Sequence, residues 1–547
     1  MKTGNSKKSA LVIASFFFMA IIVFTIQSCI KDNFKLDKLA KTEWNPNIAV
    51  PLVYSSLTVQ DILTKEDHQG LIVVGNDNFC TLVYKGNLFS LKGDSLVQLP
   101  ILPQLSSYPT PPLSAGQINT LSTGTLVATY SSTVTFISGA NNPLIDSILF
   151  KTGNMNISMS SFFKFSGQIV IKIPAAKKNG IAFSKILPFT YSTTVPVNAT
   201  ANCDLTGYTF DMTIGGTTSN QFIVDYDVTI FGPGTVSGTE QMTINQSLNN
   251  LKFDKIFGDI GHLSLSPNKD TVEIAIFKRA LGTGTFTLVN PSVKVVISNS
   301  LGVPIDATIS QLDGFNPPAS MYPITGSPNP LPIFSPNFSQ IGQTLIGSFT
   351  LDNTNSNIVQ VINNTPKDVI YKINSWSNPL GATHANFVID TSRFKVDMEI
   401  DLPLYGTAKD FVLMDTVPIN LDQTVSDNVE SALFRIYNLN GFPLDINMQA
   451  YFTDTLYNKL DSLVIPNQVI IPSAVVSSTT GMVVASTQKT YDAVVNKARF
   501  ANLKTAKHVL LKAVAATTNG GNTNVKIYST YRLDVKLGVQ IQIKSKI

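Results

Sequence analysis

The chain has 547 residues, of which 44% are hydrophobic and only 14% are charged. This composition excludes a coiled coil and a disordered tail, and it is typical of exported β-proteins with packed cores. Three of the 40 Lys and Arg residues are Lys2, Lys7 and Lys8, so the rest of the chain carries 37 basic residues against 36 acidic ones. A nearly neutral chain has no global positive field, and the sequence predicts no nucleic-acid partner.

The first 28 residues have the pattern of a secretory signal. The three lysines precede the apolar run Ala10–Ile26, which is followed by Gln27-Ser28-Cys29. A basic segment, an apolar segment and a small residue before a cysteine predict a lipoprotein signal peptide over residues 1–28. Cys29 then becomes the lipidated N-terminus. An uncleaved membrane anchor is the alternative, because an apolar run of 17 residues could just span a bilayer.

The segment after the signal supports an envelope location. It contains Trp44-Asn45-Pro46 and continues into an apolar stretch that ends at Val53. This opening resembles outer-membrane lipoproteins of Bacteroidota. The resemblance implies a body held at the outer membrane by its N-terminal lipid, facing the periplasm or the cell surface.

Residues 29–125 are predicted to form a tether and a small β-rich region. Within it, Ser56–Leu63 is predicted to contain a short helix, since Thr58 and Asp61 have the spacing of a capping box. Leu99–Pro112 contains five prolines, which exclude it from the centre of a sheet. We therefore expect a boundary or an extended crossing there.

Two further modules are expected between residues 126 and 424. Residues 126–316 are predicted to form a β-sandwich-like module, because strand-length apolar segments recur between turn residues. Ile169, Ile171 and Ile173, for example, should share one face of a strand. Residues 317–424 are predicted to form a proline-rich link and a β-rich module, with the proline-rich segment Pro317–Pro336 either linking or edging two domains.

Residues 425–547 are predicted to form a C-terminal β-sandwich-like module. Tyr491–Ala516 is the only sizeable helix candidate, and its pattern is partly that of a β-strand. The final strand, Arg532–Lys544, alternates apolar and polar residues over its whole length, which indicates one buried and one wet face. The predicted fold class is therefore mainly all-β: several antiparallel sandwich-like modules with long amphipathic strands and a few short helices.

Two segments repeat the same residues at the same offsets, 139 positions apart. They share Asn, Gly, Pro, an aliphatic residue and Asp, and we expect a strand–turn–strand unit in each, with Gly allowing positive φ and Pro leading into the second strand. The matched turn residues are Asn299, Gly302, Pro304 and Asp306 in the first copy, and Asn438, Gly441, Pro443 and Asp445 in the second. The motif resembles the type 2 late-embryogenesis-abundant β-sandwich, and this resemblance implies an immunoglobulin-like fold.

Two cysteines remain after Cys29. Cys80 and Cys203 could pair as a disulfide in an oxidising compartment, or they could be two buried free thiols.

No constellation of catalytic or metal-binding residues is evident in the sequence. The four histidines are isolated from other metal-ligand types. Asp397, Glu399 and Asp401 share one strand face, but a flat strand supplies too few converging oxygens for Ca²⁺, so a solvated face is expected. We predict a protein that is not an enzyme and has no cofactor.

The leading functional prediction is binding or scaffolding at the outer membrane, with envelope proteins as partners. One alternative is the binding or transfer of a lipid or another apolar ligand through a tubular β cavity. Another is a glycan-binding surface lipoprotein. A continuous apolar cavity would favour lipid transfer, and an exposed aromatic platform would favour glycan binding.

Overall fold

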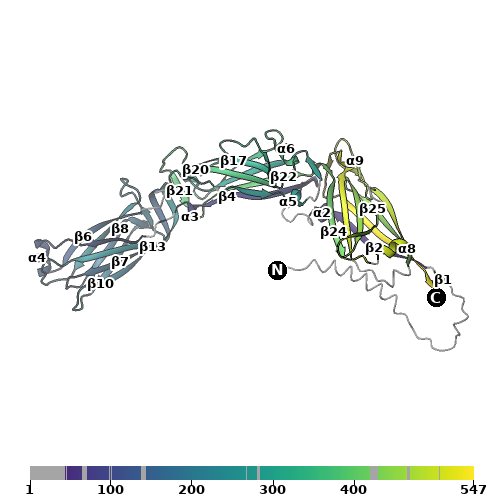
Figure 1. Ribbon diagram of the computed structural model, residues 1–547. Helices are drawn as coiled ribbons and strands as arrows, with labels where there is room; N and C mark the ends of the chain where they lie inside the picture. Colours follow the sequence, from purple (N-terminus) through teal and green to yellow (C-terminus); the bar gives the residue numbers. More distant parts are fainter. Residues whose placement is uncertain are drawn as a thin grey trace, which may run out of the picture.

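The computed structural model describes residues 43–44, 46–63, 71–97, 99, 102–136, 143–266, 268–279, 284–418, 429–464, 468–503 and 505–546. Strands dominate, almost all sheets are antiparallel, and the helices are short, which confirms the predicted all-β class. Three modules follow one another in an arch (Figure 1). We call them the distal module (102–259), the middle module (71–97 and 260–403) and the terminal module (43–63 and 404–546).

The chain runs through the arch twice, out and back. β2 (Asn47–Thr58) lies in the terminal module, β4 (Cys80–Lys92) in the middle module, and β5 (Leu102–Pro109) in the distal module. The return path leads back to β33 (Arg532–Ile543), which pairs with β2. Both ends of the described chain therefore lie in the same module, and the distal module lies at the other end of the arch (Figure 1).

This nested path corrects the predicted consecutive domains. Residues 29–125 contribute strands to all three modules instead of forming a region of their own, and the boundaries at 126, 317 and 425 do not match the modules. The physical reason is that strands far apart in sequence pair through backbone groups that every residue carries, and such pairing leaves no local sequence pattern.

The distal module is a sandwich of two antiparallel sheets. One has the order β9-β8-β12-β6 and the other β10-β7-β13-β5, and the short β11 joins them by pairing with both β7 and β8. Its elements are β5 (Leu102–Pro109), α4 (Ala115–Thr123), β6 (Leu126–Thr135), β7 (Leu144–Ser161), β8 (Gly167–Lys178), β9 (Ile181–Phe189), β10 (Val197–Asp204), β11 (Thr209–Asp211), β12 (Gln221–Ile230) and β13 (Met242–Asp259). Among the described strands, the proline-rich β5 pairs with β13 alone, so it is an edge strand, the position in a sheet that tolerates proline.

Alternating side chains fill the interior of the distal module. Ile169, Ile171 and Ile173 are fully buried, as their spacing predicted. A buried polar bridge also connects the two sheets: the Tyr226 hydroxyl donates to Gln246 Oε1 at 2.6 Å, and Gln246 Nε2 donates to Ser132 Oγ at 2.8 Å. Because each buried polar group has a partner, the bridge fixes one relative position of the sheets.

The middle module is a second sandwich. Its sheets have the orders β19-β16-β22-β4-β3 and β14-β20-β17-β18. Its elements are β3 (Leu71–Val74), β4 (Cys80–Lys92), α3 (Gly93–Leu96), β14 (Asp270–Glu273), α5 (Ala275–Arg279), β16 (Ser292–Asn299), β17 (Ile305–Asn316), β18 (Ser320–Pro323), η2 (Phe338–Gln340), β19 (Leu345–Leu351), α6 (Ile358–Asn363), β20 (Asp368–Ser377) and β22 (Arg393–Pro403), while β21 (Asn386–Ile389) pairs with the end of β13. Pro317–Pro336 edges this module through β18 and does not link two modules.

The terminal module has two main four-stranded sheets, β2-β33-β25-β30 and β24-β31-β26-β27. Its elements are β1 (Glu43–Trp44), β2 (Asn47–Thr58), α2 (Val59–Leu63), β23 (Tyr405–Lys409), β24 (Phe411–Pro418), β25 (Val429–Asn440), β26 (Leu444–Thr453), β27 (Lys459–Ser462), β28 (Val475–Val476), β29 (Val483–Ala485), β30 (Thr487–Asn496), α8 (Lys497–Leu503), β31 (His508–Thr517), α9 (Thr518–Gly521), β32 (Val525–Lys526), β33 (Arg532–Ile543) and β34 (Ser545–Lys546). The predicted capping box opens α2: Asp61 Oδ2 accepts from Thr58 N at 2.9 Å, and Thr58 Oγ1 accepts from Asp61 N at 3.3 Å.

The predicted helix over Tyr491–Ala516 is wrong. The segment contains most of β30, the short helix α8 and most of β31. In β30 the buried residues are Tyr491, Ala493 and Val495, a period of two that fits a strand and not a helix. In the final strand, β33, Leu533 and Val539 are buried, and the other apolar residues of the same face are half-buried.

The buried apolar side chains form two clusters. One runs continuously through the distal and middle modules, and the other fills the terminal module. A small three-stranded sheet, β15-β23-β32, lies where the middle and terminal modules meet, with β15 spanning Thr285–Leu288. The distal and middle modules therefore share one core, whereas the terminal module has a core of its own.

Candidate functional site

The predicted signal peptide and Cys29 lie outside the described residues. Within the described part of the chain, no helix is both long and apolar enough to cross a membrane.

The two repeat segments form the same local structure in two modules. β16 and β17 lie in opposite sheets of the middle module, and β25 and β26 lie in opposite sheets of the terminal module. Each turn therefore carries the chain from one sheet across to the facing sheet.

A buried asparagine clamps each of these turns. Asn299 Oδ1 accepts from Leu301 N at 2.9 Å, and its Nδ2 donates to Phe334 O at 3.1 Å. In the second copy Asn440 makes the matching contacts, with Phe442 N at 2.8 Å and Pro472 O at 2.8 Å. The structural counterpart of Asn299 is thus Asn440, two residues after the Asn438 that the offsets had matched. The sequence comparison missed Asn440 because the number of residues between the clamping asparagine and the following proline differs by two between the two turns.

The other matched residues also have structural roles. Asn438 is fully buried and donates to Ile470 O at 3.0 Å, and Asp445 Oδ1 accepts from Ser473 N at 2.8 Å. Pro304 and Pro443 directly precede β17 and β26, and Asp306 lies in β17 opposite Trp376.

The turn glycines do not have the predicted positive φ. Gly302 instead exchanges two backbone hydrogen bonds of 3.0 Å with Phe387, and a Cβ at this position would lie 2.1 Å from the Phe387 ring. Gly441 N donates to Arg532 O at 2.9 Å, and a Cβ there would lie 2.9 Å from the same oxygen. At both positions the absence of a side chain therefore allows another strand to approach closely.

The two remaining cysteines are free and buried, so no Cys80–Cys203 disulfide forms. Cys80 begins β4, whereas Cys203 lies in the distal module. Burial raises the pKa of Cys80, and it raises the pKa of Cys203 to about 11, so neither thiol is activated for chemistry at neutral pH.

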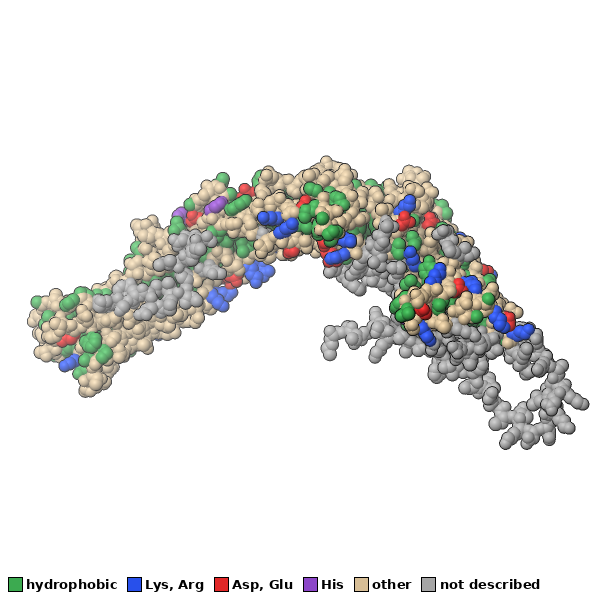
Figure 2. All heavy atoms as spheres, in the orientation of Figure 1, with side chains coloured by type: hydrophobic (Ala, Val, Ile, Leu, Met, Phe, Trp, Pro, Cys, Tyr) green, Lys and Arg blue, Asp and Glu red, His purple; other side chains and the backbone are tan. Residues whose placement is uncertain are grey.

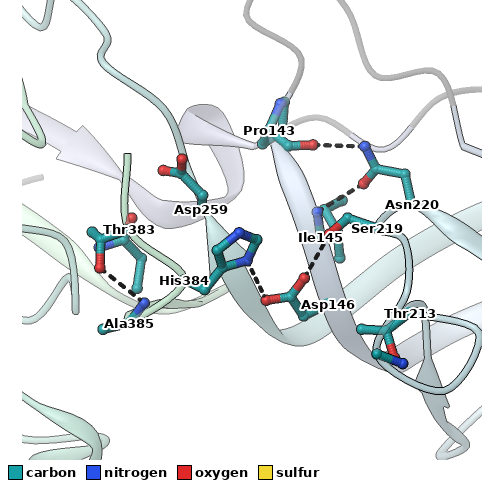
Figure 3. Close-up of polar contacts among 12 residues, drawn as sticks. Pro143, Ile145, Asp146, Thr213, Ser219, Asn220, Asp259, Thr383, His384 and Ala385 are labelled. Carbon is teal, nitrogen blue, oxygen red and sulfur yellow. Dashed lines mark hydrogen bonds and ion pairs between the residues drawn. The ribbon is translucent and has the colours of Figure 1, made fainter. Parts of the chain in front are cut away.

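A histidine, an aspartate and a serine meet where the distal and middle modules join (Figure 3). His384 Nδ1 lies 2.6 Å from Asp146 Oδ2, and Ser219 Oγ donates to Asp146 Oδ1 at 2.8 Å. The carboxylate lies between the other two groups, whereas a nucleophilic triad requires the histidine in that position. The contact connects β7 to the loop before β21, and its three groups are not arranged as a nucleophilic triad.

The carboxylates on β22 form an ion-paired face and not a metal site. Asp397 pairs with Lys395 at 2.7 Å, and Glu399 pairs with Lys85 at 3.2 Å. Burial, and then the neighbouring Glu399, raise the pKa of Asp401. Among the described residues, no group of three or more His, Cys, Asp or Glu side chains could hold a metal ion.

An apolar cavity of about 150 Å³ lies between the middle and terminal modules. Phe286, Leu404, Phe411 and Phe442 are among its lining residues. Known ligand pockets occupy about 300–1,000 Å³, and a cavity of about 150 Å³ accommodates a molecule the size of benzene. This cavity is therefore too small to act as a lipid tunnel.

A shallow hollow of about 380 Å³ lies on the outer face of the terminal module. Tyr54 and Tyr437 border it, and Lys536 Nζ lies 5.4 and 5.6 Å from their ring centroids. The Lys536 ammonium lies over one face of each ring, so these two tyrosines do not form a free aromatic platform.

A groove of about 450 Å³ lies on the outer face of the distal module, and we call it the polar groove. Its outward side chains form two rows across three strands, and none of them is charged. One row is Thr200, Ser158 and Asn245, and the next is Asn202, Asn156 and Ser247, in the strand order β10, β7, β13.

The groove side chains have few protein partners. Within the described part of the chain, Asn156, Ser158, Thr200, Asn202 and Asn245 make no side-chain hydrogen bond to another residue. The sequence of β7 contains a signal for this face, since exposed Asn156 and Ser158 alternate with the buried Met155, Ile157 and Met159. Only the pairing of β7 with β10 and β13 turns that alternation into a two-dimensional array.

The opposite outer face of the same module is different. There the Thr129 hydroxyl donates to Asp227 at 2.8 Å, the Ser131 hydroxyl donates to Asp225 at 2.6 Å, and Lys172 pairs with Asp227 at 2.5 Å. The charged groups of this face therefore bond to neighbouring side chains, whereas five side chains of the polar groove make no such bond within the described part of the chain.

No protein-family model and no curated protein matches this chain. A crystal structure of a protein from Parabacteroides distasonis ATCC 8503, described as secreted, is similar over 53% of this chain and 89% of its own length, with 12% identity and a TM-score of 0.27. The VP2 subviral particle of infectious bursal disease virus is similar over 74% of this chain and 75% of its own, with 10% identity and a TM-score of 0.15. TM-scores this low carry no information about function.

Proposed function

We propose that this protein is a non-enzymatic lipoprotein of the outer membrane that holds a binding module away from the membrane. The observation that carries the proposal is the nested path of the chain, because the first and last described strands pair with each other in the terminal module. A lipid on Cys29 would tether that end of the arch, and the distal module would project from it.

The shared core of the distal and middle modules supports a stiff projection. Charge is also unevenly distributed: on the face in Figure 2, few charged side chains lie on the distal module, and more lie on the middle and terminal modules. The paired strand–turn–strand corners support the resemblance to type 2 late-embryogenesis-abundant sandwiches in the middle and terminal modules.

The test combines lipid labelling with photo-crosslinking in intact cells. The wild type should incorporate labelled palmitate, and Cys29→Ser should not. A photo-reactive amino acid replaces Phe162, which follows β7 at the far end of the distal module, or Tyr54 in the terminal module; their side chains are 52% and 69% exposed.

The residue at position 162 should capture an envelope component only when Cys29 is present. The residue at position 54 is the matched control at the tethered end, and it should not capture the same component. Equal labelling of wild type and Cys29→Ser, or capture at position 54 alone, would contradict the proposal.

A further inference from the structure

We infer that the polar groove of the distal module binds an uncharged polysaccharide chain. The inference names the ligand class of the proposed binding module and so rests on the proposed function. Its basis is the chemistry of the two rows of side chains, their spacing and their rigid support.

The lining of the groove excludes a charged ligand. No Lys, Arg, Asp or Glu residue lines it. An anionic ligand would find no cation to replace its lost hydration, and a cationic ligand would find no carboxylate. The same module does carry charges, both on its opposite face and elsewhere on the strands of this sheet, but none of them is among the residues that line the groove.

The side chains match a ligand rich in hydroxyl groups. Asn156, Asn202 and Asn245 each offer two amide donors and one carbonyl acceptor, and Ser158 and Thr200 each offer a hydroxyl that can donate and accept. Sugar hydroxyl groups also donate and accept. Each unengaged groove side chain can therefore exchange its bond to water for a bond to a sugar hydroxyl.

The spacing favours a chain of repeated units over a single small molecule. Side chains on one strand face recur about every 6.8 Å along the strand, and neighbouring strands lie about 4.8 Å apart. The two rows therefore present similar groups at a regular interval. A polymer can make the same contacts row after row, and its affinity is the sum of many weak contacts.

The groove is built on rigid elements. β7 and β13 each have 18 residues, and β7 pairs with β10 on one side and with β13 on the other. Beneath the groove, Met155, Ile157 and Met159 are buried in the core. A preorganised face of this kind loses little entropy when a ligand binds.

The test is affinity electrophoresis of the body, residues 30–547, in native gels. The gels contain dextran, a soluble β-1,3-glucan or α-mannan as uncharged polysaccharides, or polygalacturonate as an anionic one. Ser158→Trp places a bulky side chain in the centre of the groove. Thr133→Trp is the matched control, because Thr133 is exposed on the opposite outer face of the same module. Thermal melts of both variants establish that each is folded.

At least one uncharged polysaccharide should retard the wild type and Thr133→Trp. Ser158→Trp should lose about tenfold in affinity, equivalent to about 1.4 kcal/mol. Retardation by polygalacturonate alone, no retardation by any polymer, or equal retardation of the two variants would overturn the inference. Capture of an envelope protein at position 162 by a protein that binds no polysaccharide would leave the proposed function standing and reject only this ligand class.

Discussion

Replacing Asn299 by alanine should destabilise the middle module strongly. The side chain is 1% exposed and makes three hydrogen bonds: to Leu301 N at 2.9 Å, Phe334 O at 3.1 Å and Ser335 Oγ at 3.0 Å. A single hydrogen bond contributes a net ~0.5–1.5 kcal/mol, so the loss of all three should lower the free energy of unfolding by about 3 kcal/mol. Each kcal/mol shifts the Tm of a domain of ~150–250 residues by about 2–4 °C, and the distal and middle modules share one core and form a larger unit, so we expect a drop near the lower end, roughly 6 °C.

Differential scanning calorimetry of residues 30–547 can measure this change, because it separates the transition of the distal and middle modules, which share one core, from that of the terminal module. Asn353→Ala is the control: Asn353 is exposed in the same module, and its side chain makes no hydrogen bond to another described residue. Asn440→Ala should produce a similar drop in the transition of the terminal module, since Asn440 makes the same kind of contacts. If Asn299→Ala melts within about 1 °C of Asn353→Ala, the buried clamp contributes nothing and the reasoning fails.

Three further predictions concern a carboxylate, a thiol and a glycine. Burial tends to raise the pKa of Asp461, but hydrogen bonds from Arg499 and the Ser462 backbone, together with the positive charges of Arg499 and Lys459, outweigh it and hold this pKa below its usual value of 3.8. A lowered pKa stabilises the folded state above pH 3.8, and this stabilisation is lost as the pH falls below that value. Asp461→Asn should therefore lower the Tm at neutral pH, and a Tm difference that does not shrink below pH 3.8 would be inconsistent with this. Cys203, whose pKa burial raises to about 11, should react with Ellman's reagent at pH 8 only after unfolding, and reaction of the native protein would refute its burial. Gly302→Ala should destabilise by about 1–3 kcal/mol in urea titrations, since its methyl would overlap the Phe387 ring, and an unchanged urea midpoint would disprove this close packing.

The sequence by itself determined which side of many strands is buried. In β22 the residues Val396, Met398, Ile400 and Leu402 are all buried, on the face opposite to the three carboxylates that were predicted to share one strand face. Side-chain direction in a strand alternates with a period of two, so one apolar face is visible in the sequence before any partner strand is known. The capping box at Thr58 and Asp61 was predictable for a similar reason, because its contacts lie within a single turn.

The tertiary structure alone decided which strands are neighbours. The pairing of β2 with β33 brings together the two ends of the described chain, and it could not be predicted because backbone hydrogen bonding is the same for nearly every residue. For the same reason, the polar groove could not be predicted from the sequence. Asn156 and Ser158 alternate visibly along β7, but Thr200 and Asn245 join them only through the pairing of β10, β7 and β13. A strand's own sequence specifies the face on which its polar groups lie, and only the pairing of distant strands determines which groups meet there.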